Sequence, residues 1–223
     1  MDEKDERSAL LSALTTEHMV MQTAINASVN EAQSRASMFI GVLSGALVAM
    51  GFATQSEAFF FPFVATVLPA VFVMGLFTVL RLVDISIEGA RAELRIATIR
   101  RFYRELGPRG PELFSKELGR WPEGRDNPAL RLGTLIAYWT SAAAMIAAID
   151  ALVGAGAIAL TLLLGADLNL FLALAAGAVV LVGLLLAFHW LQKLRIAEND
   201  RYAREIAGLE PNYDTQLPKA EAR

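Results

Sequence analysis

The sequence contains no cysteine and only two histidines among its 223 residues. The absence of cysteine excludes disulfide bonds, thiolate metal sites and cysteine nucleophiles. With only two histidines and no cysteine, a catalytic zinc centre is not expected. The chain also lacks P-loop, dinucleotide-binding, zinc-protease, serine-hydrolase and protein-kinase signatures. We therefore expect a protein that is not an enzyme and that holds no metal and no cofactor.

Charge is scarce as well, because only 19% of the residues are charged, whereas 55% are hydrophobic and the mean hydropathy is +0.43. An average soluble domain is about 25% charged. The apolar residues form four runs, and a helix needs roughly 20 such residues to cross a bilayer. The sequence thus predicts an all-α polytopic membrane protein with four transmembrane helices. These are residues 38–54, residues 59–80, a third run that starts between residues 132 and 142 and ends at 164, and residues 168–191.

The distribution of lysine and arginine predicts how these helices are oriented. The links between the first and second runs (residues 55–58) and between the third and fourth (residues 165–167) contain neither residue. Links this short predict two helical hairpins. Positive residues are retained in the cytoplasm, so we expect both links outside and both termini inside.

Polar helices are predicted to extend the spans into the cytoplasm. Residues 7–35 form an amphipathic helix that runs into the first span, and residues 84–106 continue the second span until Gly107 and Pro108 end it. Because both segments are amphipathic and flank the same hairpin, we expect them to pack together and to bury Ile99. The predicted apolar face of the first consists of Leu11, Leu14, His18, Met21 and Ile25.

The chain is expected to have four parts. Residues 1–106 hold the N-terminal helix, the first hairpin and its cytoplasmic helix. Residues 107–131 are a linker with four prolines. Residues 132–207 hold the second hairpin and a polar continuation of its last helix, and residues 208–223 are a disordered tail.

Small residues recur every four positions in three of the runs, a spacing that lets two helix backbones approach closely. Two interpretations remain open, namely packing among the four spans of one chain or a surface for self-association into a homo-oligomer. The residues are Gly41 and Gly45 in the first run, Ala143, Ala147, Ala151, Ala155 and Ala159 in the third, and Ala173 and Gly177 in the fourth.

Asp150 is the one ionisable residue inside the third apolar run. A carboxylate in hydrocarbon costs several kcal/mol unless it is paired, protonated or hydrated. Thr78, Arg81 and His189 are predicted at a similar depth, so these four residues could form an intramembrane polar site. The site is either structural, with the carboxylate satisfied by a neighbour, or an ion or proton site, or part of an aqueous vestibule. We expect Asp150 to pair with Arg81.

The strongest basic patch lies beyond the second span. It would suit anionic headgroups, a nucleotide or an acidic soluble partner in the cytoplasm, but no aromatic pattern accompanies it, so nucleic acid is not expected. The patch comprises Arg91, Arg95, Arg100, Arg101 and Arg104.

Several short stretches resemble uncharacterised four-span membrane proteins of high-GC bacteria. They are Glu17-His18, Gln22-Thr23-Ala24, Asn30-Glu31-Ala32, Arg35 and the stretch from Arg81 to Ser86. The resemblance implies the bacterial inner membrane and no particular activity. Hairpins with long cytoplasmic helices are also similar to SLATT-type effectors of bacterial conflict systems, which are thought to damage membranes after a cytoplasmic sensor fires.

Two functions follow as hypotheses. The first is a self-associating, channel-like or membrane-effector assembly. The second is a membrane scaffold or regulatory subunit that docks a soluble partner through its cytoplasmic helices. A transporter would require an oligomer, because four spans with short links offer little enclosed space.

Overall fold

A computed structural model describes residues 3–114 and 139–208, and all regular structure in these two ranges is helical. The predicted all-α class is confirmed for this part of the chain. Most of the expected linker (residues 115–131) and nearly all of the expected tail (residues 209–223) lie outside the described residues. The helices are α1 (Glu3–Ala53), α2 (Glu57–Glu105), α3 (Gly110–Leu113), α6 (Ala142–Gly165) and α7 (Leu170–Gly208).

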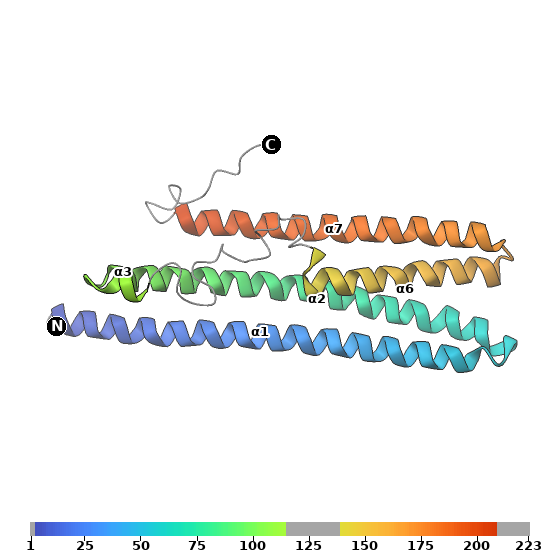
Figure 1. Cartoon of the computed structure of the whole chain (residues 1–223), viewed down its shortest axis with the longest axis horizontal. Helices are drawn as coiled ribbons and strands as arrows, with labels where there is room; N and C mark the ends of the chain where they lie inside the picture. Colours follow the sequence, from blue (N-terminus) through green and yellow to red (C-terminus); the bar gives the residue numbers. More distant parts are fainter. Residues whose placement is uncertain (1–2, 115–138, 209–223) are drawn as a thin grey trace.

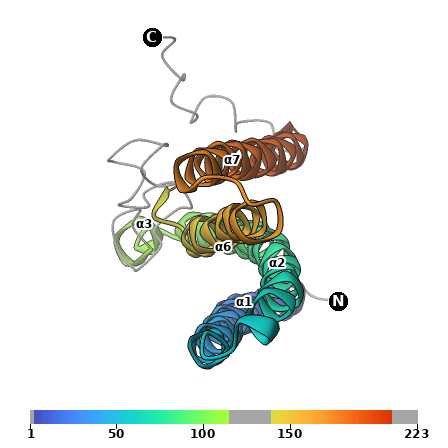
Figure 2. The same ribbon diagram turned by 90° about the vertical axis from the view of Figure 1, so that its right-hand side faces the viewer.

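The four long helices lie side by side in the order α1, α2, α6, α7 (Figure 1; Figure 2). Helix α2 contacts α1, α6 and α7, and α6 contacts α2, α7 and, slightly, α1. In the described residues α1 and α7 do not contact each other, so they form the two edges of an open row. An open row leaves one full face of each edge helix without a partner among residues 3–114 and 139–208.

The helices α1, α2, α6 and α7 are each long and apolar enough to cross a membrane, as predicted. Their apolar parts also carry large side chains that no other part of the described chain covers. Phe171 is 84% exposed, Val179 72% and Phe52 69%. Such surfaces are stable in lipid and unfavourable in water.

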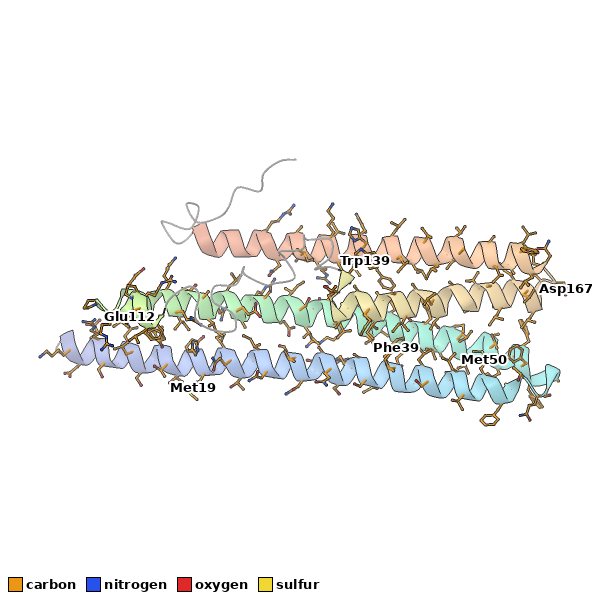
Figure 3. The ribbon with its side chains drawn as sticks, viewed as in Figure 1. Met19, Phe39, Met50, Glu112, Trp139 and Asp167 are labelled. Atoms are coloured by element: carbon orange, nitrogen blue, oxygen red, sulfur yellow. The ribbon has the colours of Figure 1, made fainter. Side chains whose placement is uncertain are left out.

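Helices α1 and α2 run without interruption from their polar parts through their apolar parts, which confirms the predicted continuity. They contain 51 and 49 residues. At 1.5 Å per residue each is roughly 75 Å long, more than twice the thickness of the hydrocarbon. Figure 3 shows side chains along both helices over this whole length, with Phe39 between helices and Met19 on the outside. Helix α2 ends at Glu105, immediately before the Gly107-Pro108 stop.

Local chemistry explains where the second pair of helices begins. The Ser141 hydroxyl accepts a hydrogen bond from the Ala144 N–H at 3.1 Å and caps α6. The Asn169 side chain accepts one from the Leu172 N–H at 2.9 Å and caps α7. Between them Asp167 adopts a φ of 53°, a left-handed conformation that aspartate tolerates better than most residues. Asp167 and the Asn169 cap lie in the tight turn between α6 and α7, whereas the Ser141 cap lies at the other end of α6.

The predicted contact between the polar parts of α1 and α2 is confirmed. Each of the five residues of the predicted apolar face of α1 is half-buried, whereas the residues between them are exposed. On α2, Ile99 is only 6% exposed. Further along, a core of apolar side chains joins α1, α2, α6 and α7 around Phe39, Val79, Ile146 and Phe188.

Candidate functional site

Asp150 lies where α6 meets α2 and α1, opposite a glycine on α2. Its exposed fraction is 0%, and among the described residues neither carboxylate oxygen has a hydrogen-bond partner. A Cβ atom placed on Gly75 would collide with this carboxylate and would lie 2.8 Å from Cε2 of Phe39 on α1. The missing side chain at Gly75 therefore provides the space that the carboxyl group fills. We call Asp150, Gly75 and Phe39 the Asp150 notch.

The predicted ion pair between Asp150 and Arg81 is wrong. The Arg81 guanidinium binds two other carboxylates, Glu31 and Glu88. Arg81 lies six residues beyond Gly75 on α2, and its side chain reaches carboxylates that remain one third to one half exposed. An arginine at the end of an apolar run extends toward the polar region, where its charge stays solvated.

The other two residues of the predicted polar site do not contact Asp150 through a hydrogen bond either. The Thr78 hydroxyl donates to the Met74 carbonyl oxygen of its own helix at 2.8 Å. The His189 ring stacks on Trp139, with 6.5 Å between ring centroids. The structure therefore does not assemble the four predicted residues into one site, and it leaves Asp150 alone in an apolar environment.

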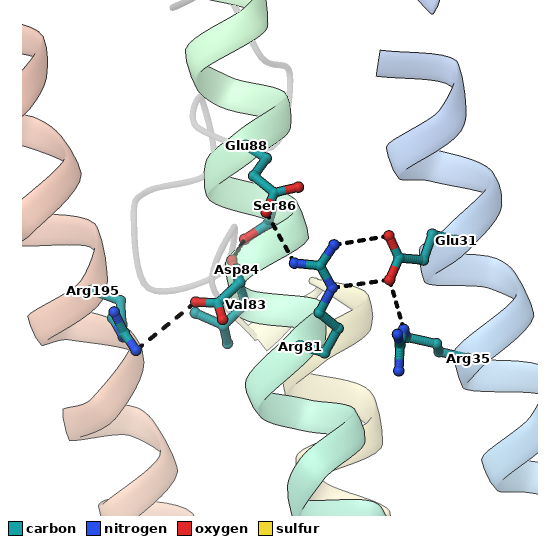
Figure 4. Close-up of polar contacts among 8 residues, drawn as sticks. All are labelled: Glu31, Arg35, Arg81, Val83, Asp84, Ser86, Glu88 and Arg195. Carbon is teal, nitrogen blue, oxygen red and sulfur yellow. Dashed lines mark hydrogen bonds and ion pairs between the residues drawn. The ribbon is translucent and has the colours of Figure 1, made fainter. Parts of the chain in front are cut away.

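Arg81 is the centre of a charged cluster that joins α1 to α2 (Figure 4). Its Nε and Nη2 donate to the two carboxylate oxygens of Glu31 at 2.9 Å each, and its Nη1 donates to Glu88 at 2.9 Å. Arg35 also donates to Glu31, at 2.8 Å. We call Glu31, Arg35, Arg81 and Glu88 the Arg81 cluster.

The Arg81 cluster fixes the position of α1 along α2 more than it adds to the stability of the fold. Hydrogen bonds from Arg81 and then from Arg35 lower the pKa of Glu31 to about 2, so this carboxylate stays ionised at any physiological pH. Because the side chains of the cluster are one third to one half exposed, water screens much of the attraction. The two-pronged geometry nevertheless sets the register of α1 against α2.

Two weaker contacts join α7 to the polar part of α2. Arg195 lies 4.0 Å from Asp84 (Figure 4), and the Arg91 Nε donates to the side-chain oxygen of Asn199 at 3.1 Å. The polar continuation of α7 is therefore held against α2.

The arginines of the predicted basic patch start from different sides of α2, and binding of a partner by this patch stays a prediction. Residues nine positions apart lie on roughly opposite sides at about 100° per residue. Arg91 thus faces α7, whereas Arg100 lies near His18 on α1. Burial lowers the pKa of His18, and the charge of Arg100 lowers it further. The residues distributed around α2 are Arg91, Arg95, Arg100, Arg101 and Arg104.

The alanine stripe of α6 packs inside the chain, which confirms the intramolecular interpretation for α6 and α7. Four of its five members, from Ala143 to Ala155, are at most 7% exposed. A Cβ atom on Gly177 would lie 3.1 Å from the Ala155 carbonyl oxygen and 3.1 Å from the Ala159 Cβ atom. Ala173, the other member of the α7 pair, is 1% exposed. Helices α6 and α7 therefore approach closely through small residues.

The glycine pair of α1 behaves differently. A Cβ atom on Gly41 or on Gly45 would have nothing within 4 Å, and both residues are exposed. Intramolecular packing is therefore the wrong interpretation for this pair within the described residues. The two glycines lie on the outer face of the edge helix.

An apolar groove lies at the far polar end of the molecule, between the start of α1 and the end of α2 with α3. Its volume is about 660 Å³, and its walls include Leu11, Met19, Leu113 and Phe114. The rings of Tyr103 and Phe114 are in contact in a tilted arrangement, with 5.3 Å between their centroids. We call this feature the α1–α3 groove.

Sequence reasoning missed Gly75, Glu88 and the α1–α3 groove. One signal was present for Glu88, because it lies seven residues after Arg81 and therefore on the same side of α2. No comparable signal marks Gly75, which is a lone glycine in an apolar run. Among residues 3–114 and 139–208 no group of three or more potential ligands could hold a metal ion.

Comparisons with protein-family models, curated proteins and solved structures find no match to this chain. The resemblance to four-span bacterial membrane proteins stays a prediction.

Proposed function

We propose that this protein is a non-enzymatic integral membrane protein of the bacterial inner membrane that self-associates through α1 into a channel-like or membrane-effector assembly. The proposal rests on one observation, the uncharged outer face of α1. Every position of this face is exposed and occupied by a small or uncharged residue. We call it the α1 seam, and it consists of Ala13, Thr16, Val20, Thr23, Ala27, Asn30, Ser34, Ser37, Gly41, Ser44, Val48 and Gly51.

The α1 seam follows a heptad repeat over about 57 Å at 1.5 Å per residue. Its first half lies in the polar part of α1, where a water-facing surface would carry charges. Its second half lies in the apolar part, where a lipid-facing surface would carry large apolar side chains. Small uncharged residues in both halves are what a closely packed second helix requires. The continuity of the α1 seam therefore favours a protein partner over lipid or water.

A second copy of the chain fits this surface. All copies have the same orientation in a membrane, so two α1 helices would meet in parallel and in register. Asn30 would then face Asn30 of the other copy, and the two side-chain amides could form a hydrogen bond with each other. At the flanking heptad positions the uncharged Asn26 would face Glu31, so like charges do not meet.

Cysteine cross-linking tests this association without interference, because the chain has no native cysteine. Ala27→Cys on the α1 seam should form disulfide-linked dimers in membranes. Val29→Cys should not, although Val29 is 58% exposed, because it lies on another face of α1. Equal cross-linking at both positions would show random collision and would contradict a specific α1 contact.

Dimer formation and ion flux can be measured separately on the same variants. Gly41→Ile should reduce both dimer formation and ion flux in liposomes, whereas Val42→Leu on a neighbouring face should change neither. Dimers without flux would favour a structural assembly over a channel. Asp150 is enclosed by its own chain and so does not support a role in lining a pore.

The proposed orientation places both helix-connecting turns outside and the polar ends of the helices in the cytoplasm. The absence of lysine and arginine from residues 55–58 and 165–167 supports it. Gln55→Cys should react with a membrane-impermeant maleimide in intact spheroplasts, whereas Ser12→Cys should react only after permeabilisation. The reverse pattern would require the opposite orientation.

The α1–α3 groove favours a second candidate function, a scaffold that docks a soluble partner. The groove is apolar, lies at the end farthest from the proposed membrane region, and could take an apolar side of a helix. A soluble protein that binds the wild type but not Leu113→Glu, while cross-linking through Ala27→Cys persists, would favour this function.

A further inference from the structure

Asp150 is enclosed by three helices, and no residue in the described part of the chain forms a hydrogen bond with its carboxyl group. Its own helix contributes Ile146, Ala147 and Ala151, which are at most 2% exposed. Helix α2 contributes the backbone at Gly75, and α1 contributes the ring of Phe39, which is 1% exposed. An ionised carboxylate in such a place would lose its hydration and gain no partner.

The charged and titratable groups nearest to the Asp150 notch are engaged elsewhere. Toward the polar end of the molecule, the next charged residues on α1 are Arg35 and Glu31, and the next on α2 is Arg81, all within the Arg81 cluster. Asp84 follows on α2 and lies 4.0 Å from Arg195 of α7. On α7 the nearest is His189, which stacks on Trp139. Helix α6 has no other ionisable residue between Ala142 and Gly165. No cation of the described chain therefore compensates a negative charge on Asp150.

The geometry of the Asp150 notch also does not suit a metal ion. Hard cations take about six oxygen ligands, and smaller ones keep several waters. The Asp150 notch supplies one carboxyl group against a glycine backbone and an aromatic ring. The space at Gly75 is already filled by the carboxyl oxygen, so a hydrated ion does not fit.

We propose that Asp150 is a proton-binding site, neutral while α6 is packed on α2 and α1, which releases its proton to water only when these helices separate. Binding joins one proton to one carboxylate oxygen, and release returns it to water. This proposal does not depend on self-association through the α1 seam. Proton binding would link the packing of α6 to pH.

Infrared spectroscopy of the full chain in lipid nanodiscs tests the protonation state directly. With ¹³C-labelled aspartate, the spectrum at neutral pH should contain the C=O stretching band of one protonated carboxylic acid. Asp150→Asn should remove that band. Asp5, Asp84 and Asp167 are in contact with solvent, unlike Asp150. A wild-type spectrum with only ionised aspartate carboxylates at neutral pH would overturn the proposal. This result does not require the Asp150→Asn variant to fold.

The pH dependence of stability provides an independent measurement. The folded state would hold a proton that the unfolded state gives up, so wild-type stability relative to Asp150→Asn should fall as the pH rises from acid to alkaline. The amide cannot ionise, and all other titrating groups are common to both proteins. A difference between the two proteins that does not change with pH, or that grows in favour of the wild type as pH rises, would contradict a bound proton.

Discussion

Replacing Gly75 by alanine is expected to lower the free energy of unfolding by about 1–3 kcal/mol, as overpacking of a tight core usually does. The new methyl group would occupy the position of the Asp150 carboxyl group and would press on Phe39. Both neighbours are fully buried, so neither can move into solvent. Titration with dodecyl sulfate in mixed micelles would measure the change.

Gly89→Ala is the matched control, since Gly89 lies on the same helix and a Cβ atom there would have nothing within 4 Å. This change should stabilise the protein by up to about 1 kcal/mol through helix propensity. In an Asp150→Ala background, Gly75→Ala should be less harmful than in the wild type, because one of the two clashes has been removed. Strict additivity of the two changes would show that Gly75 and Asp150 do not interact.

Replacing Ile99 by aspartate is expected to destabilise the protein by on the order of 3 kcal/mol, because it places an unpaired carboxylate in an apolar contact. Ile99 is 6% exposed and lies on the polar part of α2, where α2 packs on α1. Thermal unfolding in detergent, monitored by circular dichroism, would detect the loss.

Thr98→Asp tests whether the effect arises from burial or only from the added charge. Thr98 is exposed and adjacent in the sequence, so this variant should unfold within about 0.5 kcal/mol of the wild type. If both variants unfolded at the wild-type temperature, the polar parts of α1 and α2 would have to be separate in solution.

The helices themselves could be predicted from the sequence because their signals are local. Uninterrupted apolar runs define the four candidate spans, and Gly107-Pro108 ends α2 where expected. The spacing of Leu11, Leu14 and Ile25 also identified the side of α1 that faces α2. Each of these inferences requires only the geometry of one helix.

The contacts between helices could not be predicted, because they depend on how one helix is shifted along another. Arg81 and Glu31 are 50 residues apart in the sequence, and only the register of α2 against α1 brings them together. The same register places Phe39 and Gly75 beside Asp150. Depth in the membrane suggested Arg81 as the partner of Asp150, but depth does not determine the direction in which a side chain points.

The unbroken helix between Gly75 and Glu105 gives α2 the properties of a lever. Its arm is about 45 Å long at 1.5 Å per residue, so a tilt of roughly 5° about Gly75 would displace the far end by about 4 Å. A continuous helix transmits such a tilt because its hydrogen-bonded backbone resists bending. Because the Arg81 cluster ties this arm to α1, and Asp84 and Arg91 tie it to α7, a tilt of α2 at the Asp150 notch would move the polar ends of all three helices together.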